Sequence, residues 1–238
     1  IVVVRRGEND LQTRWRNGPA QMRFALAEQA LLGPLLAEAK IAAAGAAGIV
    51  ITGRSVDRGN AVARSITAEH GTPARFVCAD FGSPEDCARV LAETDAAFGR
   101  VNVLVNAGAM TDRGTILDTT PELFDRMFAT NVRGPFFLMQ NAIKLMIRDG
   151  IEGAICNIGS ISALAGQPFI NVYCASKGAL TTLTANTAFS VMANRIRVNQ
   201  LNVGWMASDA EQALQVRESG DADWMAKADR KSTRLNSS

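Results

Sequence analysis

The residues best suited to chemistry gather around the only tyrosine of the chain. Tyr173 is followed four residues later by Lys177, one helical turn away on the same face if the segment is helical. Ser160 stands thirteen residues before Tyr173, and Asn131 precedes both. A phenol normally titrates near ~10, and a nearby cation favours its ionised form. The set predicts that Tyr173 exchanges a proton as general acid or base, with Ser160 donating a hydrogen bond to a substrate oxygen.

Each of these residues also has a structural interpretation when it is taken alone. Asn131 can be a buried helix amide bonded to the backbone, and Ser160 can cap the turn that follows it. Lys177 can be a solvated charge on a helix. None of these roles requires this order and spacing together, so the joint pattern favours chemistry.

Other kinds of reaction centre lack the residues they need. The one histidine, His70, lies at an expected helix end, where a surface position is favoured, so histidine-based triads are excluded. The four cysteines form no C-x-x-C pair and match neither a zinc site nor a disulfide framework. We therefore expect no metal site, and reduced thiols in a cytoplasmic protein.

The bulk composition indicates a globular protein of one domain. The chain has 238 residues, of which 47% are hydrophobic and 20% are charged, with a net charge of +2. So small a charge gives no polyanion-binding surface, and nucleic acid is not an expected partner. No run approaches the ~18 apolar residues of a membrane span, and the charges follow the first apolar run, the wrong order for a signal peptide.

From residue 41 onward, short apolar runs alternate with helical segments. The runs are continuous rather than alternating in polarity, which is typical of strands covered on both faces. The expected strands are 47–53, 74–80, 101–108, 153–160 and 196–204, and the expected helices are 55–71, 83–99, 120–150 and 172–192. The pattern predicts an α/β fold: a single-domain, Rossmann-type, doubly wound parallel sheet flanked by helices, with ligands at the carboxyl ends of the strands.

The order of several motifs resembles the short-chain dehydrogenase/reductase family, over roughly residues 41 to 210. The matching stretches are "VNAG" (105–108), "TNV" (130–132), "NIGS" (157–160), "YCASK" (173–177) and "RVNQLNVGW" (197–205). The resemblance implies an oxidoreductase that transfers a hydride between NAD(P)(H) and an alcohol or ketone. It gives Asn131, Ser160, Tyr173 and Lys177 catalytic roles. It also implies that Lys177 holds the nicotinamide ribose, and that Asn131 anchors a water that links Lys177 to solvent.

The resemblance also assigns a cofactor-binding set. Its members are Arg54, Asp80, Phe81, Asn106, Ala107, Gly108, Tyr173, Lys177, Gly204, Met206 and Ser208. Gly108 has no Cβ to block a cofactor. Asp80 is also a good turn residue, which is the alternative interpretation. Relatives pair through the helices after the third and fourth strands, so a homodimer or homotetramer is an expectation.

The end of the first expected strand bears on cofactor choice. NAD-selecting Rossmann folds place a carboxylate there to bind the ribose 2′-hydroxyl. This chain has Gly53 followed by Arg54, and a guanidinium can pair with a 2′-phosphate. The sequence favours NADP(H) over NAD(H), with a surface arginine in a turn as the alternative.

Both ends of the chain depart from the family pattern. The T-G-x-x-x-G-x-G phosphate loop is expected near residues 27–34, where "AEQALLGP" stands, and "GAAG" (45–48) precedes a strand instead of following one. We therefore divide the chain into an atypical segment 1–40 that lacks a regular first strand, a Rossmann-type core 41–229 without a visible last strand, and a non-native-looking tail 230–238.

These departures leave alternative functions open. One hypothesis is an ordinary enzyme core with an out-of-frame amino end and a truncated carboxyl end. The alternative to a working oxidoreductase is a catalytically inactive remnant or binding module without a phosphate loop. A flavodoxin-like or response-regulator domain shares the sheet but predicts no Ser–Tyr–Lys set.

Overall fold

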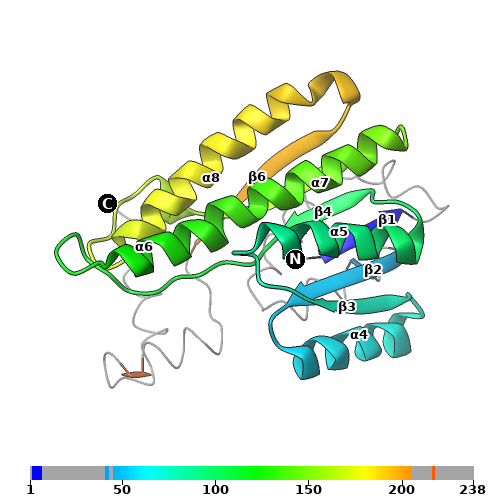
Figure 1. The fold of residues 1–238 in the computed structure, drawn as a ribbon, viewed down its shortest axis with the longest axis horizontal. Helices are drawn as coiled ribbons and strands as arrows, with labels where there is room; N and C mark the ends of the chain where they lie inside the picture. The colour runs from blue at the N-terminus through cyan, green and yellow to red at the C-terminus, as the bar shows by residue number, and fades with distance from the viewer. Residues whose placement is uncertain (1, 7–40, 43–44, 205–215, 218–238) are drawn as a thin grey trace, which may run out of the picture.

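The apolar runs predicted from the sequence form one twisted sheet. The structure, a computed structural model, describes residues 2–6, 41–42, 45–204 and 216–217. Within these residues the sheet has six strands in the order β3-β2-β1-β4-β5-β6 (Figure 1). The strands are β1 (Val2–Arg6), β2 (Ala46–Gly53), β3 (Ala74–Cys78), β4 (Val103–Asn106), β5 (Ala154–Ser160) and β6 (Arg197–Val203).

The five strands after residue 45 run parallel to one another, as predicted. β2 pairs with β3, β4 with β5, and β5 with β6, all in parallel register. Their carboxyl ends meet at one edge of the sheet, which is where open α/β sheets bind ligands. We call this edge the carboxyl edge.

The amino-terminal segment differs from its prediction. The sequence predicted no regular first strand, whereas the run of Val2–Arg6 forms β1 in the centre of the sheet, antiparallel to both neighbours. A short β-branched apolar run is typical of a strand, but no helix pattern follows this one, so the sequence does not show that it belongs to the sheet. Arg6 pairs with Ala46, so β1 ends at the edge opposite the carboxyl edge. The predicted lack of a last strand and the tail 230–238 concern residues that lie outside the described ranges.

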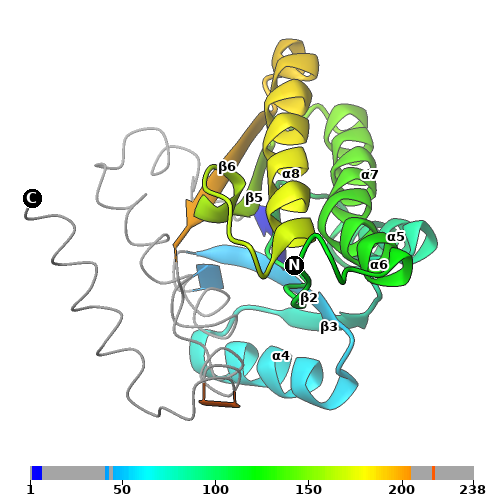
Figure 2. The same cartoon turned by 90° about the vertical axis from the view of Figure 1, so that its left-hand side faces the viewer.

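Helices cover the sheet and connect its strands. They are α4 (Val56–His70), α5 (Pro84–Phe98), α6 (Pro121–Phe128), the π turn η1 (Ala129–Arg133), α7 (Gly134–Arg148), the short 3-10 turns η2 (Ile161–Ala163) and η3 (Met192–Asn194), and α8 (Asn171–Ser190). Ser83 caps α5 by accepting from the Asp86 N–H, and the left-handed Gly71 and Gly99 end α4 and α5. Figure 2 shows α5, α7 and α8 together on one face.

The largest core cluster lies between the sheet and these three helices. Leu104 on β4 and Ile155 on β5 are at most 1% exposed and pack against the inner sides of α5 and α7. Fully buried aliphatic side chains each contribute ~2 kcal/mol, so this layer holds the parallel strands and their carboxyl edge in place.

The helix predicted over residues 120–150 contains a π turn. α6, η1 and α7 follow one another without a break, and η1 inserts a wider turn at Ala129–Arg133. Asn131 lies in this turn and is 1% exposed. Wider turns of this kind are frequent at functional sites. Helical periodicity alone does not show where such a turn occurs.

Gly134, the first residue of α7, provides a stability test. A Cβ at this position would overlap the Phe81 carbonyl oxygen, whereas a Cβ at Gly178 in α8 would meet nothing closer than 4.0 Å. We expect Gly134→Ala to lower the free energy of unfolding by about 2 kcal/mol through overpacking. Gly178→Ala is the matched control, and it should raise stability by up to about 1 kcal/mol because alanine favours helices. Urea unfolding measures both, and equal effects would contradict this account of the α7 start.

Candidate active site

The start of α8 is fastened to the loop that follows β4. The Gly114 N–H donates to the Phe169 carbonyl at 3.0 Å, and the Asn171 N–H donates to the Gly114 carbonyl at 3.1 Å. These bonds fix the first turn of α8, which carries Tyr173 on its third residue. The first turn of α8 is therefore held at the carboxyl edge, in a defined position relative to β4 and β5.

Ser160, at the end of β5, has two hydrogen-bonding roles. Its Oγ accepts from the Ser162 N–H at 3.1 Å, so the capping interpretation of the sequence describes a real contact. The same side chain hydrogen-bonds Tyr173 and lowers the pKa of its phenol. Since the hydroxyl oxygen accepts from Ser162, its hydrogen is left to donate toward the tyrosine oxygen. The structure therefore brings Ser160 and Tyr173 together.

The net pKa of Tyr173 differs in direction from the sequence expectation. Burial raises the pKa of this phenol, and this effect outweighs the lowering by Ser160. The expected lowering by Lys177 does not appear among the causes of the shift. Desolvation penalises the phenolate, so in this structure Tyr173 is held protonated at neutral pH. That protonation state suits a general acid in carbonyl reduction.

Lys177 is buried beside Tyr173, which excludes the solvated-charge interpretation. It is 3% exposed, and its Nζ lies 5.7 Å from the centre of the Tyr173 ring. Nζ donates to the Ile158 carbonyl of β5 at 2.8 Å. Burial lowers the pKa of Lys177 from 10.5 to about 8, so the amine is still mainly protonated at neutral pH.

Asn131 ties the loop after β4 to α8. Its Oδ1 accepts from the Met110 N–H at 2.8 Å, and its Nδ2 donates to the Met110 carbonyl at 2.9 Å. Nδ2 also donates to Ser176 Oγ at 3.0 Å, and Ser176 in turn donates to the Tyr173 carbonyl. Asn131 is thus a buried helix amide bonded to the backbone, which is the structural interpretation that the sequence allowed. That side chain lies in contact with the residue preceding Lys177.

The end of β4 is joined to β5 by an amide pair. Asn106 Nδ2 donates to Asn157 Oδ1 at 2.8 Å, while Asn106 Oδ1 is buried without a hydrogen-bond partner. Ala107 is exposed at the edge. A Cβ on Gly108 would overlap the Phe81 ring, so the missing side chain at Gly108 makes room for Phe81.

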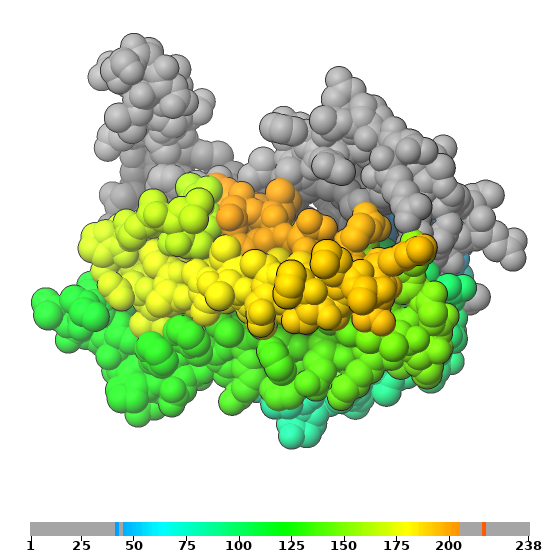
Figure 3. Space-filling model, turned by 90° about the horizontal axis from the view of Figure 1, so that it is seen from above, coloured from blue at the N-terminus to red at the C-terminus, as the bar shows by residue number. Residues whose placement is uncertain are grey.

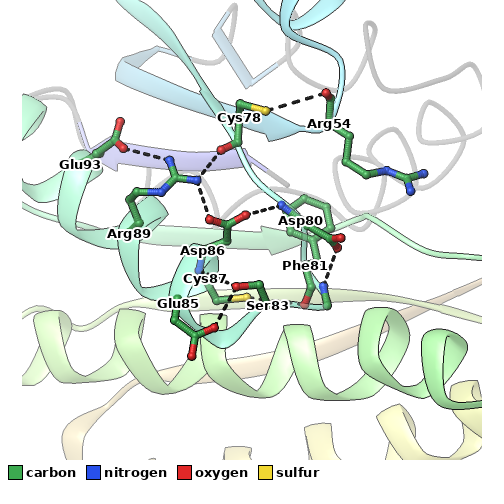
Figure 4. A network of polar contacts seen from close by, with 11 residues as sticks. Arg54, Cys78, Asp80, Phe81, Ser83, Glu85, Asp86, Cys87, Arg89 and Glu93 are labelled. Atoms are coloured by element: carbon green, nitrogen blue, oxygen red, sulfur yellow. Dashed lines mark hydrogen bonds and ion pairs between the residues drawn. The ribbon is translucent and has the colours of Figure 1, made fainter.

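Figure 4 shows the polar network that orders the loop after β3. Asp80 Oδ1 accepts from the Gly82 N–H at 2.8 Å, which supports the turn interpretation of Asp80. The Asp80 N–H donates to Asp86 Oδ2 at 2.8 Å, and Asp86 pairs with Arg89 at 2.7 Å. The Asp80 N–H first, and Arg89 second, hold the pKa of Asp86 below its usual value.

The remaining predicted cofactor residues lie at the ends of β2 and β6 or outside the described part. Arg54 follows β2 and is exposed, and its guanidinium extends away from the network around Asp86 (Figure 4). Gly204 directly follows β6 and is exposed. Met206, Ser208 and the stretch 27–34, where the phosphate loop was expected, lie outside the described residues.

Sequence reasoning missed three buried polar residues next to the site. Asn157 and Thr184 bond each other at 2.8 Å between β5 and α8, and Ser176 links Asn131 to the Tyr173 carbonyl. The available signal was Asn157, an amide inside an otherwise apolar strand. A buried amide requires partners, and its presence predicts a polar network.

Comparison with known proteins identifies the family. The family profile "short chain dehydrogenase" matches residues 32–219. The chain belongs to this family. A "Sorbitol dehydrogenase" from Cereibacter sphaeroides is 34% identical over 142 residues, which span 60% of this chain and 56% of the relative. The chain thus matches little more than half of that relative's length.

Two further relatives of this short-chain dehydrogenase differ in reported character. An "Inactive 2-(S)-hydroxypropyl-CoM dehydrogenase 2" from Xanthobacter autotrophicus is 35% identical over 64% of this chain and 66% of its own length. The solved structure of L-sorbose reductase from Gluconobacter frateurii, complexed with NADPH and L-sorbose, is 26% identical. It superposes with a TM-score of 0.70 over 75% of this chain and 68% of that one. Family membership establishes the fold of the short-chain dehydrogenases over the matched residues 32–219.

The described residues fit one end of a nicotinamide dinucleotide. Lys177 uses one of its three N–H donors on Ile158, so others can meet ribose hydroxyls. The pyrophosphate needs a glycine-rich turn and a helix start after a central strand at the carboxyl edge. β1 occupies the central position but ends at the opposite edge, and no such turn lies within the described ranges. The fit therefore covers the nicotinamide ribose and leaves the phosphates without a described partner.

Among the described helices, none combines the length and apolarity needed to cross a bilayer.

Proposed function

We propose that the chain is an oxidoreductase that exchanges a hydride between NADP(H) and an alcohol or ketone. The observation that carries the proposal is the contact of Ser160 and Tyr173 with Lys177 buried beside them. NADP(H) supplies or accepts the hydride when it is bound.

The protein residues then handle the substrate oxygen and its proton. Ser160 donates a hydrogen bond to that oxygen and keeps it next to Tyr173. Tyr173, held protonated by burial, gives its proton to the oxygen during reduction and takes one during oxidation. Lys177 places a cation near the phenol and favours the phenolate left after proton transfer. The role of Asn131 in a proton relay to Lys177 belongs to this proposal.

The direct test is an assay of NADPH oxidation with a panel of small ketones and sugars, and of NADP+ reduction with the matching alcohols. Turnover above the uncatalysed rate with at least one pair is expected. Absence of turnover with all pairs, in a chain that binds NADPH, would contradict the proposal.

Arg54 is proposed to select NADP(H). The guanidinium is exposed at the end of β2, where a 2′-phosphate can reach it. We expect Arg54→Ala to weaken NADPH binding about tenfold and to leave NADH binding nearly unchanged, since a charge-assisted bond contributes about 1.5–3 kcal/mol. Calorimetric titration of both cofactors measures this. Arg58→Ala, which removes an exposed arginine in the first turn of α4, is the control, and an equal loss in both variants would refute a specific role.

A second candidate function is a catalytically inactive member of the family. The antiparallel direction of β1, which ends at the edge opposite the carboxyl edge, favours it. Titration with NADPH separates the two candidates. Binding at micromolar concentrations supports the enzyme, and no binding at millimolar concentrations supports the inactive protein.

Assembly and location are further parts of the proposal. Figure 3 shows α8 (yellow) beside α6 and α7 (green) on one face of the molecule. Phe136 on α7 is 43% exposed and Phe189 on α8 is 76% exposed, which suits pairing of two or four copies through these helices. A cytoplasmic location is proposed because the free cysteines suit a reducing compartment.

A further inference from the structure

A chain of hydrogen-bonded side chains runs from β4 to β6 beneath α8. Asn106 donates to Asn157, and Asn157 Nδ2 donates to Thr184 Oγ1 at 2.8 Å. Thr184 Oγ1 lies 3.1 Å from Gln200 Oε1 on β6. These contacts therefore lead from Asn106 at the end of β4, by way of Thr184 on α8, to the Gln200 amide on β6.

The nitrogen of the Gln200 amide makes two further hydrogen bonds. Its Nε2 donates to Thr181 Oγ1 at 2.7 Å and to Asn202 Oδ1 at 2.6 Å. Thr181 Oγ1 then donates to the Lys177 carbonyl at 2.9 Å. A directional path of two hydrogen bonds thus leads from β6 to the backbone of Lys177.

Gln200 also lies against the strand that ends in Ser160. A Cβ on Gly159 would overlap both Gln200 Nε2 and Asn202 Oδ1. Gly159 and Asn202 are paired residues of β5 and β6. Gln200 therefore fits between the end of β5 and the α8 turn that follows Lys177.

We propose that Gln200 is a positioning residue for Lys177. It holds the turn of α8 at Thr181 against β6, so that the Lys177 ammonium stays beside the Ile158 carbonyl and the Tyr173 ring. Gln200 itself contacts no reacting atom. The importance of that position for turnover rests on the proposed function, whereas the position of the ammonium does not.

Burial of Lys177 supplies a direct readout. The pKa of Lys177 is lowered to about 8 because its ammonium is desolvated. Among the described residues, the groups that meet it are the Ile158 carbonyl from β5 and the Tyr173 ring from its own helix, and the phenol is held neutral. If α8 loosens at Thr181, water reaches the ammonium and its pKa rises toward the ordinary 10.5.

The first variant to test is Gln200→Met, which keeps the length of the side chain and removes its hydrogen bonds. The control is Gln140→Met on α7, a half-buried glutamine distant in sequence from the network. NMR titration of chains labelled with 13C-lysine follows the Cε signal of Lys177, assigned by its loss in Lys177→Arg. We expect a higher Lys177 pKa in Gln200→Met, no change in Gln140→Met, and a fall of about tenfold in kcat with KM within about twofold.

Thr181→Val breaks the same path one bond later and should reproduce the shift. Because both variants cut one path, the double variant should show little beyond either single change. An unchanged Lys177 titration in both single variants, or shifts that add in the double variant, would overturn the proposal. Absence of turnover in the parent chain would count against the proposed function, and the titration would still decide the role of Gln200.

Discussion

Replacing Tyr173 by Phe is expected to reduce kcat about 1,000-fold, because a positioned proton donor contributes ~100- to 10,000-fold. The change removes one oxygen and keeps the ring that packs beside Lys177. Tyr173 is half-buried and its hydroxyl bonds Ser160, so the loss of the proton donor should not be compensated by water. Spectrophotometric turnover of NADPH with the best substrate measures the effect.

Binding and folding should survive this change. The Lys177 ammonium keeps its bond to the Ile158 carbonyl, and α8 keeps its fastening at Gly114. NADPH affinity is therefore expected to stay within about threefold, since the proposed ribose contacts come from Lys177. Thr182→Val removes a hydroxyl from the exposed face of the same helix and is the control. If Tyr173→Phe retains more than about a tenth of the turnover, Tyr173 is not the proton donor.

The sequence predicted the part of the fold that rests on local pattern. The five parallel strands and the helices between them follow from continuous apolar runs and from caps such as Ser83. β1 was missed because strand pairing depends on which neighbours are available, and a five-residue run carries no information about its direction.

The candidate site was predicted as a set of residues but not as a set of contacts. The spacing of Tyr173 and Lys177 predicted that both lie on one helix, which is α8, and their catalytic assignment stays a prediction. The burial of Tyr173 could not be predicted from the sequence, and it raises the pKa of the phenol where a lower pKa was expected. The Gln200 path was also not readable, because it joins β6 to α8 across segments that are adjacent only in the folded chain.

Lys177→Met should make the protein more stable while turnover falls by about 100-fold. A buried ammonium costs stability because water solvates it better than the protein does. The lowering of its pKa from 10.5 to about 8 corresponds to a cost on the order of 3 kcal/mol at neutral pH. Methionine fills the same space without charge and leaves only the Ile158 carbonyl without its partner, at about 1 kcal/mol. We expect a net gain of about 2 kcal/mol in the free energy of unfolding at pH 7.

The pH dependence of this gain identifies its cause. Between pH 8 and 10.5 the unfolded lysine is protonated while the folded one is not, so the unfolded state binds more protons and stability rises with pH. Cys87 and Cys156 act in the opposite direction, because burial raises their thiol pKa values from 9.0 to about 11 and their contribution is lost as the unfolded thiols ionise. The parent chain and the Lys177→Met variant both carry these thiols, so the difference between their free energies of unfolding reports the lysine alone.

That difference should be largest below pH 8 and fall as pH rises toward 10.5, where it should turn into a loss of about 1 kcal/mol from the unpaired Ile158 carbonyl. Urea unfolding at several pH values measures it, with Lys144→Met on the exposed face of α7 as the control that should show no such dependence. A gain that is constant from pH 7 to 10.5 would mean that methionine stabilises by packing alone. A buried cation that lowers the stability of the fold, placed beside the only tyrosine, is the arrangement expected of a proton-transfer site. Such sites hold a charge in a fixed position although the folded protein is less stable for it.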